Sequence, residues 1–254
     1  MIPIKVDLIS YTGIGQDVRF TPELLAYTKS TRLEQGEETR KKISEMSYGD
    51  LAKELEYMAN TIPSSWEFVD YVFEIKNVTR AFTHQFVRTR TGSYAQQTMR
   101  MLDKKEFTYR IPPRFKAPGK ELILEAYCEA MKSIQISYDA MIAAGAEVED
   151  ARGVLPTNIH TNIIAKFNLR TMAEMAKSRT GVRTQDEYRE VMEQMIEAVL
   201  AVHPWAGAFL SPPALKNVKT LEGFVQEMFD AGHIDKTKFY DMNKACDKVR
   251  KGEA

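Results

Sequence analysis

A length of 254 residues allows one large domain or two small ones, and 44% hydrophobic with 28% charged residues is typical of a soluble globular protein. The formal net charge is zero, so no overall field favours nucleic acid or a membrane as a partner, and any basic site must be local. The N-terminus has no signal-peptide pattern and no apolar run approaches the roughly 18 residues of a membrane span, so we expect a cytoplasmic protein. The two cysteines, Cys128 and Cys246, form no disulfide framework or zinc pattern, and we expect no bound metal.

Apolar periodicity in the first half of the chain predicts strands mixed with helices. The expected elements begin with a strand at residues 4–8 and a helix from Thr21, with Thr21 as N-cap and Pro22 at the first helical position. A charged, mobile surface segment at 32–42 and a helix from Ser47 follow. We then expect a central strand at 68–75, a helix from Val78 and a short strand at 107–111. This mixture predicts an α+β fold.

The second half of the chain is predicted to be helical. Apolar residues spaced three and four apart predict one stripe on a helix from Glu121 to Gly145, where packing is a better explanation than cofactor binding. Further helices are expected at residues 161–179 and 184–202, and an amphipathic helical tail at about 218–254 with a frayed, charged end. We see no linker or repeat, so residues 1–254 are expected to form a single domain.

The most unusual stretch is residues 88–100, which contains Arg88, Arg90 and Arg100 and no acidic residue. Like charges repel, and arginine offers a planar fork that matches phosphate or carboxylate, so this stretch predicts an anion site. A solvated basic loop is the alternative. Gly92, Ser93, Tyr94, Gln96, Gln97 and Thr98 in the same stretch can recognise a sugar or a base and favour the anion site.

The stretch resembles a family motif. Flavin-dependent thymidylate synthases carry R-H-R, seven residues, then S-x-R, and this chain has Arg88-Thr89-Arg90, seven residues, then Thr98-Met99-Arg100. Residues 151–156 resemble the family's A-R-x-V-L-P, and residues 157–179 continue this match without gaps. Upstream, Glu67 and residues 73–75 are similar to the family's strand, and Gln85 precedes the arginine motif. The resemblance covers roughly residues 47–202.

The resemblance implies a fold with an antiparallel β-sheet core packed with long helices, a homotetramer and a set of functional residues. The pyrimidine deoxynucleoside monophosphate would be held by Gln85, Arg88, Gln96, Thr98, Arg100, Arg152 and Arg179. The flavin would be lined by Arg88, Thr89, Arg90, Asn168, Arg170 and Glu174. Thr98 would lie beside the pyrimidine, and Arg179 would polarise the base as the second catalytic residue. A guanidinium at a uracil oxygen that gains negative charge fits this role.

The activity that this resemblance implies is methylation of dUMP to dTMP, with FAD as cofactor, NADPH as reductant and 5,10-methylenetetrahydrofolate as one-carbon donor. Neither cysteine has a supporting His or Arg motif, and the flavin route needs no cysteine nucleophile. Two alternatives stay open. One is a flavin-dependent methylase or hydroxymethylase of another pyrimidine nucleotide such as dCMP, and the other is a non-catalytic nucleotide-binding relative.

Several positions depart from the family pattern. Family histidines are replaced by Ile62, Phe68, Thr89 and Arg183. A family asparagine is Glu174, which would pair with Arg170 or Arg179, accept a hydrogen bond from an amino group such as that of cytosine, or be a plain surface residue. The chain's own histidines, His84, His160, His203 and His233, have no acid at ligand spacing, which argues against a metal site.

Overall fold

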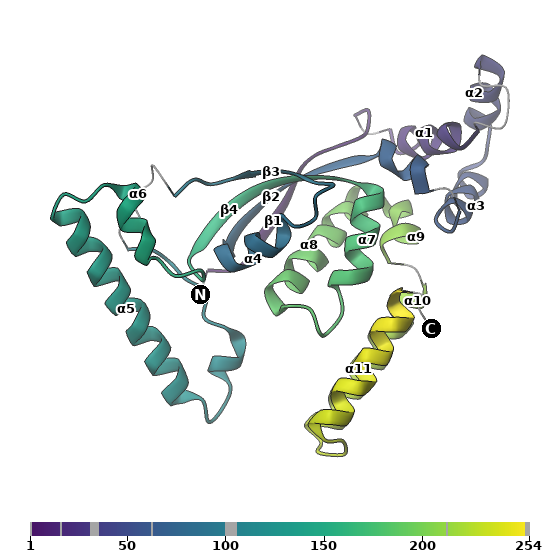
Figure 1. The fold of residues 1–254 in the computed structure, drawn as a ribbon. Helices are drawn as coiled ribbons and strands as arrows, with labels where there is room; N and C mark the ends of the chain where they lie inside the picture. The colour runs from purple at the N-terminus through teal and green to yellow at the C-terminus, as the bar shows by residue number, and fades with distance from the viewer. Residues whose placement is uncertain are drawn as a thin grey trace. The chain divides into compact units, whose positions relative to one another are not determined.

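The computed structural model describes residues 2–15, 17–30, 36–61, 63–99, 106–211 and 213–251, without the side chains of 213–216 and 251. This part of the chain combines one four-stranded sheet with helices, which confirms the expected α+β fold (Figure 1). The chain clusters into two compact units. Unit 1 consists of Met1–Lys5, Glu74–Arg90 and Tyr94–Ile164, and unit 2 consists of Val6–Phe73, Thr91–Ser93 and Ala165–Ala254.

The strands β1 (Lys5–Tyr11), β2 (Asp70–Thr79), β3 (Ser93–Gln96) and β4 (His160–Asn168) are arranged in the order β1-β2-β4-β3. The N–H of Leu169 donates to the carbonyl of Val69 (2.8 Å), and the N–H of Asn77 donates to the Asn162 side chain (3.0 Å). The end of β4 therefore lies beside the start of β2, which makes these strands antiparallel, as expected. Alternate residues of β2 are fully buried and supply the core of the sheet: Tyr71, Phe73 and Ile75.

The helix expected at residues 161–179 is wrong in its first half, which is the strand β4. Thr161, Ile163, Ala165 and Phe167 are buried while their neighbours are not, and this alternation has the period of a strand. The helix α7 (Leu169–Arg179) starts only after Asn168, whose side chain accepts from the N–H of Thr171 (2.8 Å) as an N-cap. Scattered apolar residues such as Ile164 suggested one continuous helix, but Ile164 is exposed.

The boundary between β2 and the next helix is also later than expected. The strand continues to Thr79, whose hydroxyl accepts from the N–H of Phe82 (3.0 Å), so α4 (Arg80–Phe86) begins at Arg80 and not at Val78. The residues before β2 form the 3-10 helix η2 (Pro63–Phe68), which places Phe68 outside the strand. The short strand expected at 107–111 is reduced to one isolated bridge between Tyr109 and Ile159.

The N-terminal helices differ from the prediction at their starts. Helix α1 (Phe20–Lys29) has Arg19 as N-cap, so Thr21 is inside it, and the Thr21 hydroxyl instead donates to the carbonyl of Thr12 (2.9 Å). The charged segment contains α2 (Glu37–Ser44), in which Glu38 and Lys42 pair one turn apart (2.8 Å); residues 31–35 lie outside the described residues. Helix α3 (Tyr48–Met58) begins after Ser47, as expected.

The remaining part of unit 1 is built on the long helix α5 (Glu121–Ala143), which follows the 3-10 helix η3 (Pro113–Lys116). Met131 and Tyr138 of the predicted stripe are buried on it. A short helix, α6 (Val148–Ala151), leads into the 3-10 turn η4 (Arg152–Val154). The stripe therefore faces the interior, as the periodicity indicated.

The C-terminal part of unit 2 is helical. It comprises α8 (Asp186–Val202), the 3-10 helix η5 (Pro204–Ala206), α9 (Gly207–Leu210), α10 (Pro213–Asp230) and α11 (Lys236–Lys251). The helical tail thus starts at residue 213, and α11 continues to residue 251 with Arg250 buried. Within the described residues, no helix is long and apolar enough to cross a membrane.

Candidate functional site

The arginine motif lies in a loop that leaves the C-terminus of α4. The backbone N–H groups of Arg88 and Thr89 donate to carbonyls of the last turn of α4 at 3.2 Å. On the other side, the hydroxyl of Tyr94 donates to the carbonyl of Thr89 (2.6 Å) and approaches that of Phe86 (3.1 Å). The loop is therefore held at both ends, while the side chains of Arg88 and Arg90 are exposed and the structure records no carboxylate partner for them among its described residues.

A second group in unit 1 connects β3 to α4. The side-chain nitrogen of Gln96 donates to the hydroxyl of Thr83 (2.9 Å), and this hydroxyl donates to the carbonyl of Arg80 (3.0 Å). Gln96 therefore keeps its amide oxygen as an acceptor for a ligand. Gln85 and Thr98 are exposed on the same unit, and Arg100 lies outside the described residues.

Arg80, which no sequence motif includes, is a partly buried cation of unit 1. Burial lowers the pKa of Arg80, and the positive charge of Arg152 lowers it further. In the described part of the chain no acid pairs with Arg80, and Arg152 donates only to the carbonyl of Glu149 (2.9 Å). Two neighbouring guanidiniums without an acid create a strong attraction for an anion. The sequence does place Arg80 three residues before Thr83 on α4, and therefore on the same face of that helix, which is the pattern that could have pointed to Arg80.

Arg110 adds to the positive character of unit 1, and its charge acts on His160. Burial lowers the pKa of His160, and the charge of Arg110 lowers it further. The ring nitrogen Nδ1 of His160 lies 3.0 Å from the Thr108 hydroxyl. His160 is therefore neutral at pH 7 and supplies a hydrogen-bonding group rather than a charge.

The predicted flavin residues of α7 are paired within unit 2. Nη1 of Arg170 donates to Glu67 (2.7 Å), and Nε of Arg170 donates to Glu174 (3.3 Å). These hydrogen bonds, first that of Glu67 and then that of Glu174, raise the pKa of Arg170. Asn168 is occupied as the N-cap of the helix. Of the roles open to Glu174, the structure has the pairing with Arg170.

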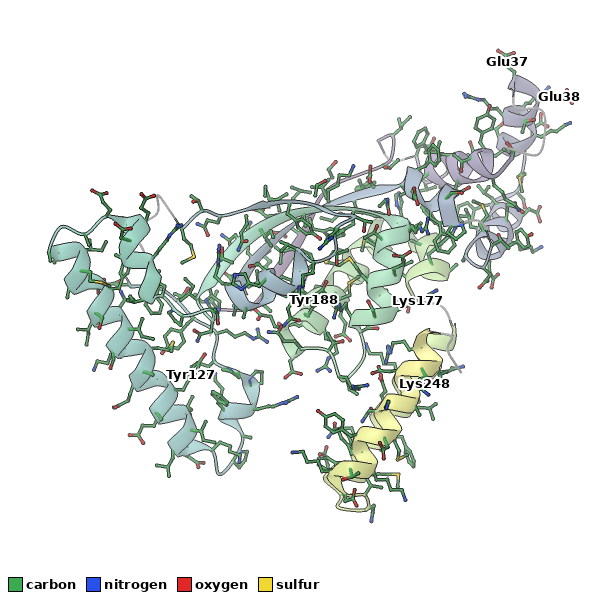
Figure 2. The ribbon with its side chains drawn as sticks, in the orientation of Figure 1. Glu37, Glu38, Tyr127, Lys177, Tyr188 and Lys248 are labelled. Carbon is green, nitrogen blue, oxygen red and sulfur yellow. The ribbon has the colours of Figure 1, made fainter. Side chains whose placement is uncertain are left out.

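Arg179 is the last residue of α7 and is half-buried. Its guanidinium carbon lies 5.0 Å from the ring centre of Tyr188, which α8 contributes and which Figure 2 labels. A cation over an aromatic face is attracted by the ring, so Tyr188 restricts the directions that Arg179 adopts. At the start of the same helix, the hydroxyls of Thr171 and Thr91 lie 3.1 Å apart, which fixes the loop after Arg90 to α7.

Comparison with known proteins places the chain in a family. Residues 7–205 match the family model described as "Thymidylate synthase complementing protein". Flavin-dependent thymidylate synthases from Saccharolobus solfataricus and Clostridium tetani are 31% and 30% identical to the chain; the matches cover 82% and 79% of this chain and 77% and 84% of those proteins. The chain belongs to the flavin-dependent thymidylate synthase family. This is a family of enzymes.

A solved structure agrees with this membership at the level of the fold. The UMP/dUMP methylase PolB from Streptomyces cacaoi, bound with 5-Br dUMP, superposes with a TM-score of 0.68. It is 18% identical, and the match covers 82% of this chain and 94% of that one. The α+β architecture is therefore that of the flavin-dependent thymidylate synthase family.

The positions that depart from the family pattern have distinct environments. Phe68 is exposed at the end of η2, and Thr89 is half-buried in the arginine loop. Arg183 pairs with Asp247 of α11 (3.4 Å), and Ile62 lies outside the described residues. His203 has a structural environment, since it is buried against the Tyr71 hydroxyl (3.0 Å). Among the residues that the structure describes, no cluster of His, Cys, Asp or Glu suits a metal ion.

Proposed function

We propose that this chain transfers a one-carbon unit from 5,10-methylenetetrahydrofolate to C5 of a pyrimidine deoxynucleoside monophosphate, converting dUMP to dTMP with FAD and NADPH. We further propose a homotetramer in the cytoplasm. The observation that carries the substrate class is the neighbouring pair Arg80 and Arg152. Its two positive charges have no acidic partner among the described residues, in a family of flavin-dependent thymidylate synthases.

The proposed nucleotide site assigns different tasks to the residues of unit 1. Arg80, Arg88, Arg100 and Arg152 supply charge for a phosphate dianion, which bidentate guanidiniums match in shape. Gln85, Gln96 and Thr98 supply hydrogen bonds to the sugar and base. Gln96 is pre-oriented for this by Thr83, so its amide loses little freedom when a ligand binds.

Arg179 is proposed to act on the base. A uracil carbonyl gains negative charge when C5 attacks an electrophile, and a preorganised guanidinium lowers the energy of that charge. Removing such a donor typically costs on the order of 3 kcal/mol of barrier. The contact with Tyr188 keeps Arg179 in place before the reaction, which is the property that this type of stabilisation needs.

The flavin residues fit FAD to different degrees. Exposed Arg88 and Arg90, with Thr89 between them, supply donors for the cofactor's phosphates. Asn168 is a helix cap, and Arg170 is shared by Glu67 and Glu174, so these residues shape the site more than they neutralise charge. When bound, FAD would supply the redox chemistry of the one-carbon transfer.

The proposal keeps uracil as the base. Reading the amino group of cytosine was one role open to Glu174, and its pairing with Arg170 supports a different role. No contact of the described residues favours the dCMP alternative or the non-catalytic alternative. Both alternatives enter as outcomes of the experiment.

The test is turnover by the purified protein supplied with FAD, NADPH, methylenetetrahydrofolate and either dUMP or dCMP, with product mass as the readout. We expect dTMP from dUMP and a visible flavin band that shifts when dUMP is added. Arg152→Ala serves as the matched loss variant and Arg40→Ala, an exposed arginine of α2, as the control. Product from dCMP alone would overturn the choice of base, and a protein that binds dUMP without flavin would be a non-catalytic relative.

A further inference from the structure

The C-terminal tail reaches the end of the helix that carries Arg179. The family match ends at residue 205, and α10 and α11 follow it. Both helices and α7 belong to unit 2, and α11 packs against α7. The contact is made at Thr180, the residue that directly follows Arg179.

Arg250 of α11 connects the end of α7 to α10 through the two terminal nitrogens of its guanidinium. Nη1 donates to the hydroxyl of Thr180 at 2.9 Å, and Nη2 donates to the carboxylate of Glu222 on α10. The hydroxyl of Thr180 in turn donates to the carbonyl of Ala176 (2.7 Å), in the last turn of α7. Arg250, Glu222 and Thr180 are all buried, with 6%, 3% and 6% of their surface exposed.

A second contact lies beside the first. Asp247, one turn before Arg250 on α11, pairs with Arg183 (3.4 Å). Gly181 passes so close to the tail that a β-carbon at this position would lie 2.8 Å from Oδ1 of Asp247 and 3.2 Å from Nε of Arg250. The backbone that follows Arg179 is therefore in direct contact with α11.

A buried ion pair between Arg250 and Glu222 would by itself be explained by packing of the tail, and such pairs are weak evidence for a stabilising role. Packing of the tail alone does not require the hydrogen bond to Thr180, which couples the buried guanidinium to the end of α7. Helix termini leave carbonyls without intrahelical partners and fray readily. In this helix the Thr180 hydroxyl satisfies one such carbonyl, and Arg250 fixes the rotamer of that hydroxyl.

We propose that Arg250 is a positioning residue for Arg179: it acts through Thr180 to hold the end of α7, and with it the direction of the Arg179 side chain. This inference rests on the proposed function, in which Arg179 stabilises charge on the pyrimidine. Tyr188 orients the guanidinium of Arg179, and the tail fixes the backbone from which it extends. Residues outside the family match thereby control a residue inside it.

The test uses the full-length protein and a matched pair of substitutions. Thr180→Val removes the hydroxyl at nearly constant volume, and Thr180→Ser keeps it. Arg250→Lys is the second variant, because one ammonium keeps a charge beside Glu222 but lacks the fork that reaches Thr180 as well. Lys248→Ala is the control on the same helix, since Lys248 is exposed (Figure 2).

The first readout is hydrogen exchange of the peptide that spans residues 175–184, with the melting temperature as a check on folding. We expect faster exchange in Thr180→Val and Arg250→Lys, and wild-type exchange in Thr180→Ser and Lys248→Ala. Unchanged exchange in both loss variants would overturn the proposal. This readout does not depend on turnover, so it separates a failure of the proposed function from a failure of this inference.

The second readout is a double-mutant cycle on turnover with Arg179→Lys. With Arg179 present, we expect Thr180→Val to lower kcat about 10- to 100-fold with a smaller change in KM, since a misplaced catalytic group affects the transition state most. In the Arg179→Lys background, the same substitution should have less than about a threefold effect. An equal loss in both backgrounds would show a purely structural role and would overturn the proposal.

Discussion

Arg80 in unit 1 and Arg170 on α7 in unit 2 have opposite electrostatic surroundings. Arg80 lies near Arg152, another cation, and its pKa is lowered by burial and by that charge. Arg170 lies between the carboxylates of Glu67 and Glu174, which raise its pKa. A guanidinium without an acid attracts an anion from solution, whereas one that two acids share has its charge compensated inside the protein. The same residue type is thus left open to an anion in one region and has its charge compensated by the protein in the other.

The largest expected effect tests the ligand-binding side of this comparison. Arg152→Ala should lower kcat/KM for dUMP by about 10- to 100-fold, because a hydrogen bond between charged groups is worth about 1.5–3 kcal/mol. With deoxyuridine, which has no phosphate, the variant and the wild type should be nearly equal. Steady-state kinetics on both substrates measure this. An equal loss with the nucleoside would mean that Arg152 does not contact the phosphate.

Loss of folding stability at low pH limits the pH range in which the arginine variants can be compared. Burial lowers the pKa of His203 to about 4, against about 6.5 in an unfolded chain. Between these values only the unfolded state takes up the proton, so stability falls as the pH decreases, by about 2 kcal/mol from pH 7 to pH 5. Urea unfolding at pH 7 and pH 5 measures this difference in the free energy of unfolding.

His203→Gln should flatten this dependence, while His233→Gln, an exposed control, should keep it. An unchanged slope in His203→Gln would assign the acid sensitivity to other groups. Kinetic comparisons of the arginines therefore belong above about pH 6.

The affinity for FAD should change in opposite directions when an unpaired arginine is removed and when an acid that pairs with an arginine is neutralised. Arg90→Ala should raise the dissociation constant of FAD about tenfold, because it removes an exposed cation that no acid pairs with among the described residues. Glu67→Gln should lower it by about threefold, since Arg170 then keeps one carboxylate and presents more positive charge. Titration of flavin absorbance measures both. Weaker FAD binding in Glu67→Gln would mean that Glu67 supports the site by geometry and not by charge.

The smallest expected effect concerns Glu174. Its side chain is 65% exposed in a pair one turn apart with Arg170, so Glu174→Asn should change the free energy of unfolding by less than about 0.5 kcal/mol. Base preference between dUMP and dCMP should stay the same. A shift in preference toward dUMP or away from it would restore the idea that Glu174 contacts the base.

Local sequence patterns predicted the elements that have strong periodicity. They failed where contacts between residues far apart in the sequence determine the secondary structure. The stripe of α5 and the start of α3 at Ser47 follow from their own neighbours. The strand β4 was mistaken for helix, because it pairs with β2 from far along the chain, as in the bond between Asn77 and Asn162, which are 85 positions apart.

The candidate site shows the same limit. Motif spacing found Arg88, Arg90 and Arg152, but it overlooked Arg80, which becomes significant only when η4 brings Arg152 near it. It selected Arg170 without its main partner, since Glu67 lies 103 residues earlier in the chain. The composition of a motif predicts which ligand chemistry is possible, and the fold determines which of its side chains are already engaged.

The close approach of Gly181 to α11 has an evolutionary consequence. A β-carbon at position 181 would lie 2.8 Å from Oδ1 of Asp247, so any residue other than glycine there requires this carboxylate to move. Relatives with such a tail and a larger residue at 181 should carry a smaller residue at 247 or a shifted last helix. Covariation of these two positions across the family would measure how strongly the last helix constrains the backbone after Arg179.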